Sequence, residues 1–295
     1  MSDGTSLYDL RSLFKAVGRF EAHRALDVSP LERQAAQAQV EVLDETTREL
    51  DGDALEVAGF VDGIQATLCV THRHQRPVYL YYVASGAVGS ETSVLGAREK
   101  VGLVCAENDV EWATTIASGV PIETMGGGSP PELERRAHQI VSGARDAIER
   151  ELISSLLRQG CGNLVVDGSL LGRDADARLF GVVKTTQSQW LDDESGLWGL
   201  RQGWRSPRFR ILGTGEAVDR YSCYVQLTDK SDGAWNNGLI RVEAYDLDSL
   251  DALGFRCLAE RQSSSSKDPR RDRHLGSVLV VEEFLRARRP AIFEL

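Results

Sequence analysis

The sequence lacks any run of eighteen or more apolar residues, so no segment is predicted to span a membrane. Its opening residues, Met1 to Thr5, also lack the basic and apolar regions of a signal peptide. The five cysteines are scattered and include no CxxC pair, which argues against a zinc site or a dithiol redox site. We therefore expect a cytoplasmic protein whose cysteines are buried, reduced thiols.

The chain also has fewer basic than acidic residues. The chain has 34 lysines and arginines against 44 aspartates and glutamates, which gives a formal net charge of −10. A protein that coats DNA through its overall field is usually basic, so this composition counts against a simple DNA-coating role. It remains compatible with a nuclease, because carboxylates gathered around a divalent metal make such an enzyme locally acidic.

The pattern divides the chain into an N-terminal segment, residues 1–50, and a larger domain, residues 51–295. Apolar residues recur at three- and four-residue intervals from Leu7 to Phe20, and Pro30 suits the first turn of a second helix. We therefore predict helices over residues 6–50. This helical segment would either cover the core or dock a partner, and the sequence leaves both open.

The larger domain is predicted to be α/β, because strands, a long helix and further strands succeed one another. A buried strand is expected to end at Asp62, and strands at 66–71 and 78–84 would complete an antiparallel meander. A helix over 131–158 follows. Later strands are expected at 163–167, 180–184, 208–212, 221–228 and 238–245, and a last helix at 278–289.

Two aspartates, Asp62 and Asp167, each follow an apolar run and precede a glycine. A strand buried on both faces delivers its last side chain to the edge of the sheet, where a carboxylate can meet solvent and metal. Asp-Gly is also a very common turn, and for either aspartate alone a turn is the better interpretation. The two together favour a site.

A third carboxylate, Glu149, falls among the apolar residues of the helix before Asp167, whereas Glu151 falls on the opposite face. A carboxylate that faces the core is costly unless it is paired or binds metal. Glu149 is therefore either a metal ligand, which we favour, or half of a buried ion pair with an arginine such as Arg145. Three carboxylates suit Mn²⁺ or Mg²⁺, and such sites hydrolyse phosphodiesters.

Several short segments, in order along the chain, resemble the motifs of the NurA nucleases. They extend from residue 61 to about residue 282 and so span most of the chain. The segments are Val61–Gly63, Val165–Leu170, Gly181–Thr185, Arg205–Phe209, Tyr221–Leu227, Gly238–Glu243, Asp268–Arg270, His274–Leu275 and Val281–Glu282.

That resemblance implies an RNase H-like mixed sheet core flanked by helices and Mn²⁺- or Mg²⁺-dependent DNA cleavage, exonucleolytic and open to endonucleolytic action. It also implies a homodimer that works with a HerA-type hexameric ATPase, in DNA-end processing for repair or in defence against phage. Asp62, Glu149 and Asp167 would correspond to the metal-binding carboxylates, and Asp268 to the final acidic position.

The C-terminal motif departs from the family pattern. Arg271-Asp272 stand where many members have an aromatic-proline pair, and an apolar residue near Leu279 stands where a histidine is often found. Ile64 also replaces the usual serine of the first motif. These departures motivate an alternative, a degenerate RNase H-like subunit that binds and regulates the ATPase without cutting. A third interpretation is an RNase H-like enzyme that cuts RNA.

Basic residues offer candidate DNA contacts. Lys184 ends an apolar strand and would contact a phosphate or lie at the surface. Arg205 and Arg241 would either contact DNA or pair with Glu243, and pairing is the safer expectation. The remaining candidates lie in or beside a basic run that a solvated loop would explain nearly as well: Arg270, Arg271 and His274.

Overall fold

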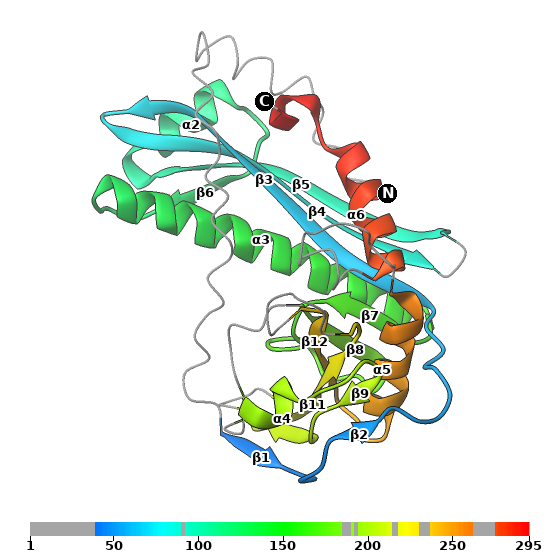
Figure 1. Cartoon of the computed structure of the whole chain (residues 1–295). Helices are drawn as coiled ribbons and strands as arrows, with labels where there is room; N and C mark the ends of the chain where they lie inside the picture. Colours follow the sequence, from blue (N-terminus) through cyan, green and yellow to red (C-terminus); the bar gives the residue numbers. More distant parts are fainter. Residues whose placement is uncertain are drawn as a thin grey trace.

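A computed structural model of the chain describes residues 39–89, 92–184, 190–191, 194–213, 218–229, 237–261 and 275–294. Within these residues the fold is α/β, with a large mixed sheet flanked by helices (Figure 1). The strands follow the order β1-β10-β11-β12-β8-β7-β3-β4-β5-β6, and β9 pairs with β11 and β2. The predicted α/β class is confirmed. Among the described residues, every helix is too short or too polar to cross a bilayer.

One half of the sheet is an antiparallel meander of long strands, but its strands differ from the predicted ones. The expected strand ending at Asp62 and the expected strand at 66–71 form one continuous strand, and the strand at 94–106 was not predicted. The meander consists of β3 (Gly59–Arg73), β4 (Arg76–Gly89) and β5 (Val94–Ala106). The turn between β3 and β4 has positive φ at both central residues, His74 and Gln75, which is the backbone of a two-residue hairpin matched to the twist of its strands. β6 (Ile122–Met125) extends this half in parallel with β5.

The other half of the sheet begins with two strands parallel to β3. β7 (Leu164–Asp167) pairs in parallel with β3, and β8 (Leu179–Val183) pairs in parallel with β7. The remaining strands are antiparallel to their neighbours. They are β12 (Leu239–Ala244), β11 (Arg220–Gln226), β10 (Phe209–Ile211) and β9 (Trp204–Arg205). The strands predicted from residue 163 onward are therefore confirmed.

Helices cover both faces of the sheet. α3 (Pro130–Arg158) runs along one face of the meander, and α6 (Gly276–Arg288) crosses the other (Figure 1). α3 begins at a capping box in which Ser129 and Glu132 satisfy each other's backbone N–H groups. The other helices in the described residues are η1 (Glu107–Asp109), α2 (Val110–Ile116), α4 (Glu194–Trp198), α5 (Ser249–Glu260) and η3 (Ala291–Glu294).

The two core layers show which residues of the central strands face which helix. Phe60 of β3 and Val165 of β7 pack in the cluster that contains Leu285 of α6. Val61 and Val166, one residue further along each strand, pack in the cluster that contains Leu152, Ile153 and Leu156 of α3. Side chains of β3 and β7 therefore alternate between an α6 face and an α3 face, as the pleat of a strand requires.

The described end of the N-terminal segment is not helical, which corrects the prediction for residues 39–50. β1 (Val40–Val42) pairs with β10, and β2 (Arg48–Glu49) pairs with β9. Two β-branched valines that alternate with a glutamate favour an edge strand over a helix. Between the two strands, Asp44 accepts hydrogen bonds from the backbone N–H and the guanidinium of Arg208. Residues 6–38 lie outside the described residues.

Candidate active site

Asp62 lies within a strand and not at its end, which corrects the predicted boundary. β3 continues past Asp62 to Arg73, and Gly63 pairs with Ser85 of β4 in the ladder. The Asp-Gly pair at this position is therefore not a turn. The second Asp-Gly pair behaves as predicted: β7 ends at Asp167, and Gly168 has a φ of +138°, which favours glycine.

The side chains of Asp62 and Asp167 extend from neighbouring parallel strands on the same face of the sheet. Asp62 pairs across the ladder with Gly86, where a Cβ atom would lie 3.0 Å from Leu285 of α6. Asp167 is two residues after Val165, which also packs on the α6 side. Because cross-strand partners and alternate residues share a face, both carboxylates start from the α6 face.

Lys184 lies beside this aspartate pair. Its Nζ donates to Asp167 Oδ2 at 2.8 Å, and the two side chains are only 18% and 23% exposed. The pKa of Asp62 is raised well above its ordinary value, first by burial and then by the charge of Asp167; Lys184 opposes this rise, and Glu149 adds to it. Lys184 is thus part of the carboxylate site and not a surface lysine.

Glu149 approaches from the opposite side of β3. Its side chain is buried on α3, and a Cβ atom added at Gly63 would lie 2.7 Å from Glu149 Oε2 and 3.2 Å from Arg145 Cγ. Since Gly63 faces α3 while Asp62 faces α6, Glu149 approaches the aspartate pair at a position of the strand that carries no side chain. Glu151 is exposed, as predicted.

The three predicted carboxylates are therefore neighbours, but they do not share one face. Both Asp167 and Glu149 are close enough to raise the pKa of Asp62. Within the part of the chain that the structure describes, no three His, Cys, Asp or Glu side chains form a ready metal-binding group. Asp62 and Asp167 are the carboxylates whose oxygen donors best fit a hard divalent cation, because both extend from one face.

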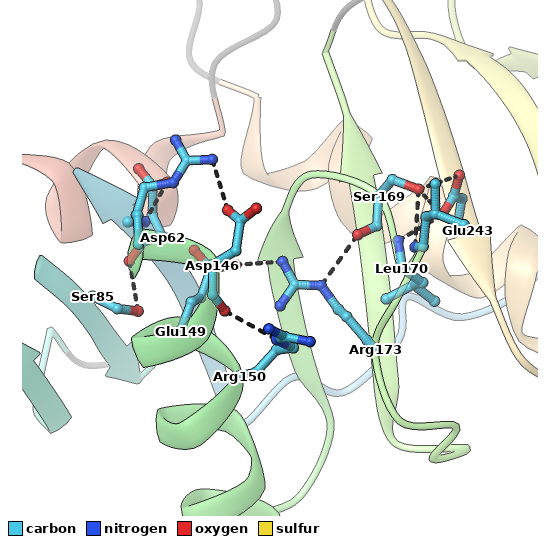
Figure 2. Close-up of polar contacts among 12 residues, drawn as sticks. Asp62, Ser85, Asp146, Glu149, Arg150, Ser169, Leu170, Arg173 and Glu243 are labelled. Atoms are coloured by element: carbon cyan, nitrogen blue, oxygen red, sulfur yellow. Dashed lines mark hydrogen bonds and ion pairs between the residues drawn. The ribbon is translucent and has the colours of Figure 1, made fainter. Parts of the chain in front are cut away.

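Arg173 is the ion-pair partner of Glu149, where the sequence suggested Arg145. One Nη of Arg173 binds Glu149 Oε1, while its Nε donates to the carbonyl oxygen of Ser169 (Figure 2). Arg145 instead contacts Asp146 at 3.0 Å. Figure 2 shows Arg173 reaching back toward α3 from the loop after β7. The predicted alternative of a buried ion pair thus describes Glu149 in this conformation.

The loop that carries Arg173 is anchored by Glu243 of β12. Glu243 is fully buried and accepts hydrogen bonds from the Leu170 N–H at 2.7 Å and from the Ser169 hydroxyl (Figure 2). Arg241 and Arg220 lie 2.8 and 3.3 Å from its carboxylate oxygens. Burial alone would raise the pKa of Glu243, but these two arginines and the hydrogen bonds outweigh it, so the pKa is lowered.

Sequence reasoning gave Glu243 only a pairing role and missed the loop altogether. The predicted Arg241–Glu243 pair is confirmed. Arg205 pairs with Asp44 at 3.2 Å and Asp251 at 2.7 Å and not with Glu243. The Arg205 side chain is 1% exposed, and a guanidinium closed off from solvent cannot reach a phosphate, which argues against the predicted DNA contact.

The remaining predicted site residues lie outside the described residues: Asp268, Arg270, Arg271 and His274. No model of a known protein family matches the chain, and no curated protein sequence matches it either. Functional assignment therefore depends on the sheet and the charged site.

Proposed function

We propose that this chain is a Mn²⁺- or Mg²⁺-dependent DNA nuclease of the NurA type, with an RNase H-like core. It would process DNA ends together with a HerA-type hexameric ATPase, in repair or in defence against phage. The observation that carries the proposal is the pair of partly buried carboxylates, Asp62 and Asp167, on one face of adjacent parallel strands, with the pKa of Asp62 raised. Strongly perturbed carboxylates of this kind gather at functional sites.

The order of the central strands supports the RNase H-like core. From β5 through β4, β3 and β7 to β8, the first three strands are antiparallel, and the last two run parallel to β3. α3 connects the antiparallel group to β7, as expected for such a core. The connection from β7 to β8, residues 168–178, contains no helix, which is a departure from a regular strand-helix-strand unit.

The energetics of the aspartate pair also support a metal-binding role. Two carboxylates that are close together and partly desolvated destabilise the folded chain at neutral pH, and a single lysine compensates only part of this charge. A divalent cation bound between Asp62 and Asp167 would remove the repulsion, and it would lower the pKa of an attacking water and stabilise the leaving oxygen. Lys184 is positioned to orient the Asp167 carboxylate or a phosphate next to it.

The net charge of −10 fits an enzyme that receives its DNA from a partner. An acidic surface repels the phosphate backbone, so this chain alone gains little from counterion release. A ring-shaped ATPase that encircles DNA would provide that attraction and feed the strand to the nuclease. The chain would act as a homodimer, as the motif resemblance implies.

The degenerate subunit is the second candidate, and one observation favours it. Asp167 and Glu149 are each paired with a basic side chain, Lys184 and Arg173. A non-cutting subunit that retains the fold to hold the ATPase would keep such pairs. The two candidates differ in whether removal of Asp62 changes any activity.

Cleavage of end-labelled linear DNA tests the proposal. The purified chain is incubated with Mn²⁺, Mg²⁺ or EDTA, with and without the cognate ATPase, and matched RNA is run in parallel. Asp62→Asn keeps the shape of the side chain and removes its charge, and Asp51→Asn at an exposed position is the matched control. We expect metal-dependent DNA degradation that Asp62→Asn abolishes and Asp51→Asn retains.

The outcomes separate the candidates. Cleavage that survives in Asp62→Asn would show that the aspartate pair is not the site. No cleavage in any condition, with the ATPase added and shown to bind, would refute the nuclease and favour the degenerate subunit. RNA cleavage without DNA cleavage would favour the RNA-cutting alternative.

A further inference from the structure

A pocket on the α3 face lies next to the Glu149–Arg173 ion pair. Its volume is about 320 Å³, and it opens between the C-terminal half of α3 and the loop that leads to β8. One wall is a single stripe of the helix, at positions 150, 153, 154, 157 and 158, and the other wall is formed by residues 173–176, 178 and 179. The volume is at the lower end of the roughly 300–1,000 Å³ that small-ligand sites occupy.

The lining combines an apolar floor with a basic rim. Ile153 and Leu179 are 4% and 1% exposed and form the floor together with Leu157. Four arginines line the pocket against two aspartates, although the whole chain carries a net charge of −10. The arginines are Arg150, Arg158, Arg173 and Arg178.

Two of the four arginines carry positive charge that no ion pair in the described residues compensates, because Arg173 pairs with Glu149 and Arg178 pairs with Asp176. Asp176 pairs with Arg178 at 2.7 Å and so is already neutralised. Arg150 has one hydrogen bond, from Nε to the Asp146 carbonyl oxygen, and among the residues that the structure describes neither Arg150 nor Arg158 forms an ion pair. Arginine forks on a pocket rim bind phosphate groups bidentately and cost little to desolvate compared with lysine.

Arg173 connects this pocket to the carboxylate site. Its Nη2 pairs with Glu149, while its Nη1 is buried without a hydrogen-bond partner. Arg150 on α3 and Arg173 on the loop come from the two walls of the pocket (Figure 2). A phosphate bound here would give Arg173 a second anionic partner, so occupancy of the pocket would loosen the hold of Arg173 on Glu149.

We propose that this pocket binds one nucleotide unit, with its phosphate on the arginine rim and its sugar or base on the apolar floor. The unit is either part of a nucleic-acid strand or a free nucleotide, since both present the same chemistry. Its use in holding a DNA strand rests on the proposed nuclease function, whereas the binding itself does not. A test without metal therefore separates the two.

The test measures binding in EDTA to the full chain carrying Asp62→Asn, so that cleavage plays no part. The probes are deoxyadenosine, deoxyadenosine 5′-monophosphate and a short single-stranded DNA with a 5′-phosphate. The affinity of each probe is measured by titration calorimetry. The pocket variant is Arg150→Gln/Arg158→Gln. Arg135→Gln, at an exposed position on the same helix outside the pocket, is the matched control.

We expect both phosphate-bearing probes to bind, deoxyadenosine to bind more weakly, and the double variant to bind phosphate probes at least about tenfold more weakly. Tighter binding of the oligonucleotide than of the mononucleotide identifies a nucleic-acid strand as the source; equal binding identifies a free nucleotide. No binding of either phosphate probe, or equal affinities for the double variant and Arg135→Gln, would overturn the proposal. Neither result depends on whether the chain cuts DNA.

Discussion

Replacing Glu243 with glutamine is expected to be among the most damaging single conservative changes in this protein. Glutamine keeps the length of the side chain and an oxygen that can still accept from the Leu170 N–H. It removes the negative charge that faces two arginines, Arg220 and Arg241, whose side chains are 3% and 6% exposed. Both guanidiniums would then be buried beside a neutral amide.

The magnitude follows from this burial. Removing one partner of a buried ion pair costs about 3–5 kcal/mol, because the other charge is left uncompensated. A domain is stable by only about 5–15 kcal/mol, so this change is a large fraction of the total. Since the entropy of unfolding is about 2.1 cal/mol/K per residue, a chain of 295 residues would melt about 5–8 °C lower.

Thermal melting with a matched control measures the effect. Glu282→Gln removes a surface ion pair with Arg286, and we expect it to cost about 1 kcal/mol or less. The pKa of Glu243 is lowered by folding, so its contribution is complete above the ordinary glutamate pKa of 4.5 and is lost as the pH falls through the folded value. The difference in Tm between wild type and Glu243→Gln should therefore shrink only in acid. Equal melting of the two at pH 7 would refute the reasoning.

Three further results are expected. Gly63→Ala should destabilise the chain by about 1–3 kcal/mol in denaturant melts, because its Cβ would lie 2.7 Å from a Glu149 oxygen, whereas Gly143→Ala, with open space around it, should not. Asp62→Asn should raise the Tm at neutral pH and lose that gain near pH 3.8. Folding raises the pKa of Asp62, so the repulsion between Asp62 and its neighbouring carboxylates grows as the pH rises. A Tm below that of the wild type at pH 7 would contradict this reasoning. Arg205→Met should lower the Tm by several degrees without changing the affinity for DNA. Weaker DNA binding by the folded variant would instead support the DNA contact predicted for Arg205 from sequence.

Long elements with a clear period were predictable from sequence. The helix over residues 131–158 matches α3, and the apolar run before Asp167 matches β7. Asp167 was placed correctly because the glycine that follows adopts a positive φ, which ends the strand. The same dipeptide at Asp62 gave the wrong boundary, because there the glycine is extended and clears space for Glu149.

The arrangement of the carboxylates could not be predicted from periodicity. A helical wheel shows that Glu149 faces the sheet, but it does not show which face of β3 the Asp62 side chain takes. That depends on the register of Asp62 with Gly86, which follows from the whole hairpin and its turn. The sequence pattern of a helix or a strand indicates which of its side chains share a face. Only the packing of the helix on the sheet determines which faces of the two elements meet.

Arg173 and the first two strands were missed for different reasons. Arg173 lies in an irregular loop with no period, and its position depends on Glu243, seventy residues later. β1 and β2 have three and two residues, which is too short for a pattern to stand out from the predicted helix. Both depend on partners that are distant in the sequence.

The pairing of β1 with β10 has a consequence for biosynthesis. Val40 lies opposite Ile211, so the first described strand cannot take its place until most of the chain has left the ribosome. The hairpin of β3 and β4 and the helix α3 need only local contacts and can form much earlier. Until β1 arrives, one side of β10 is an unpaired edge that could recruit another chain. Deletion of the residues before 43, which removes β1, should therefore reduce the soluble yield during expression. The sheet around Asp62 should change little in the protein that remains soluble.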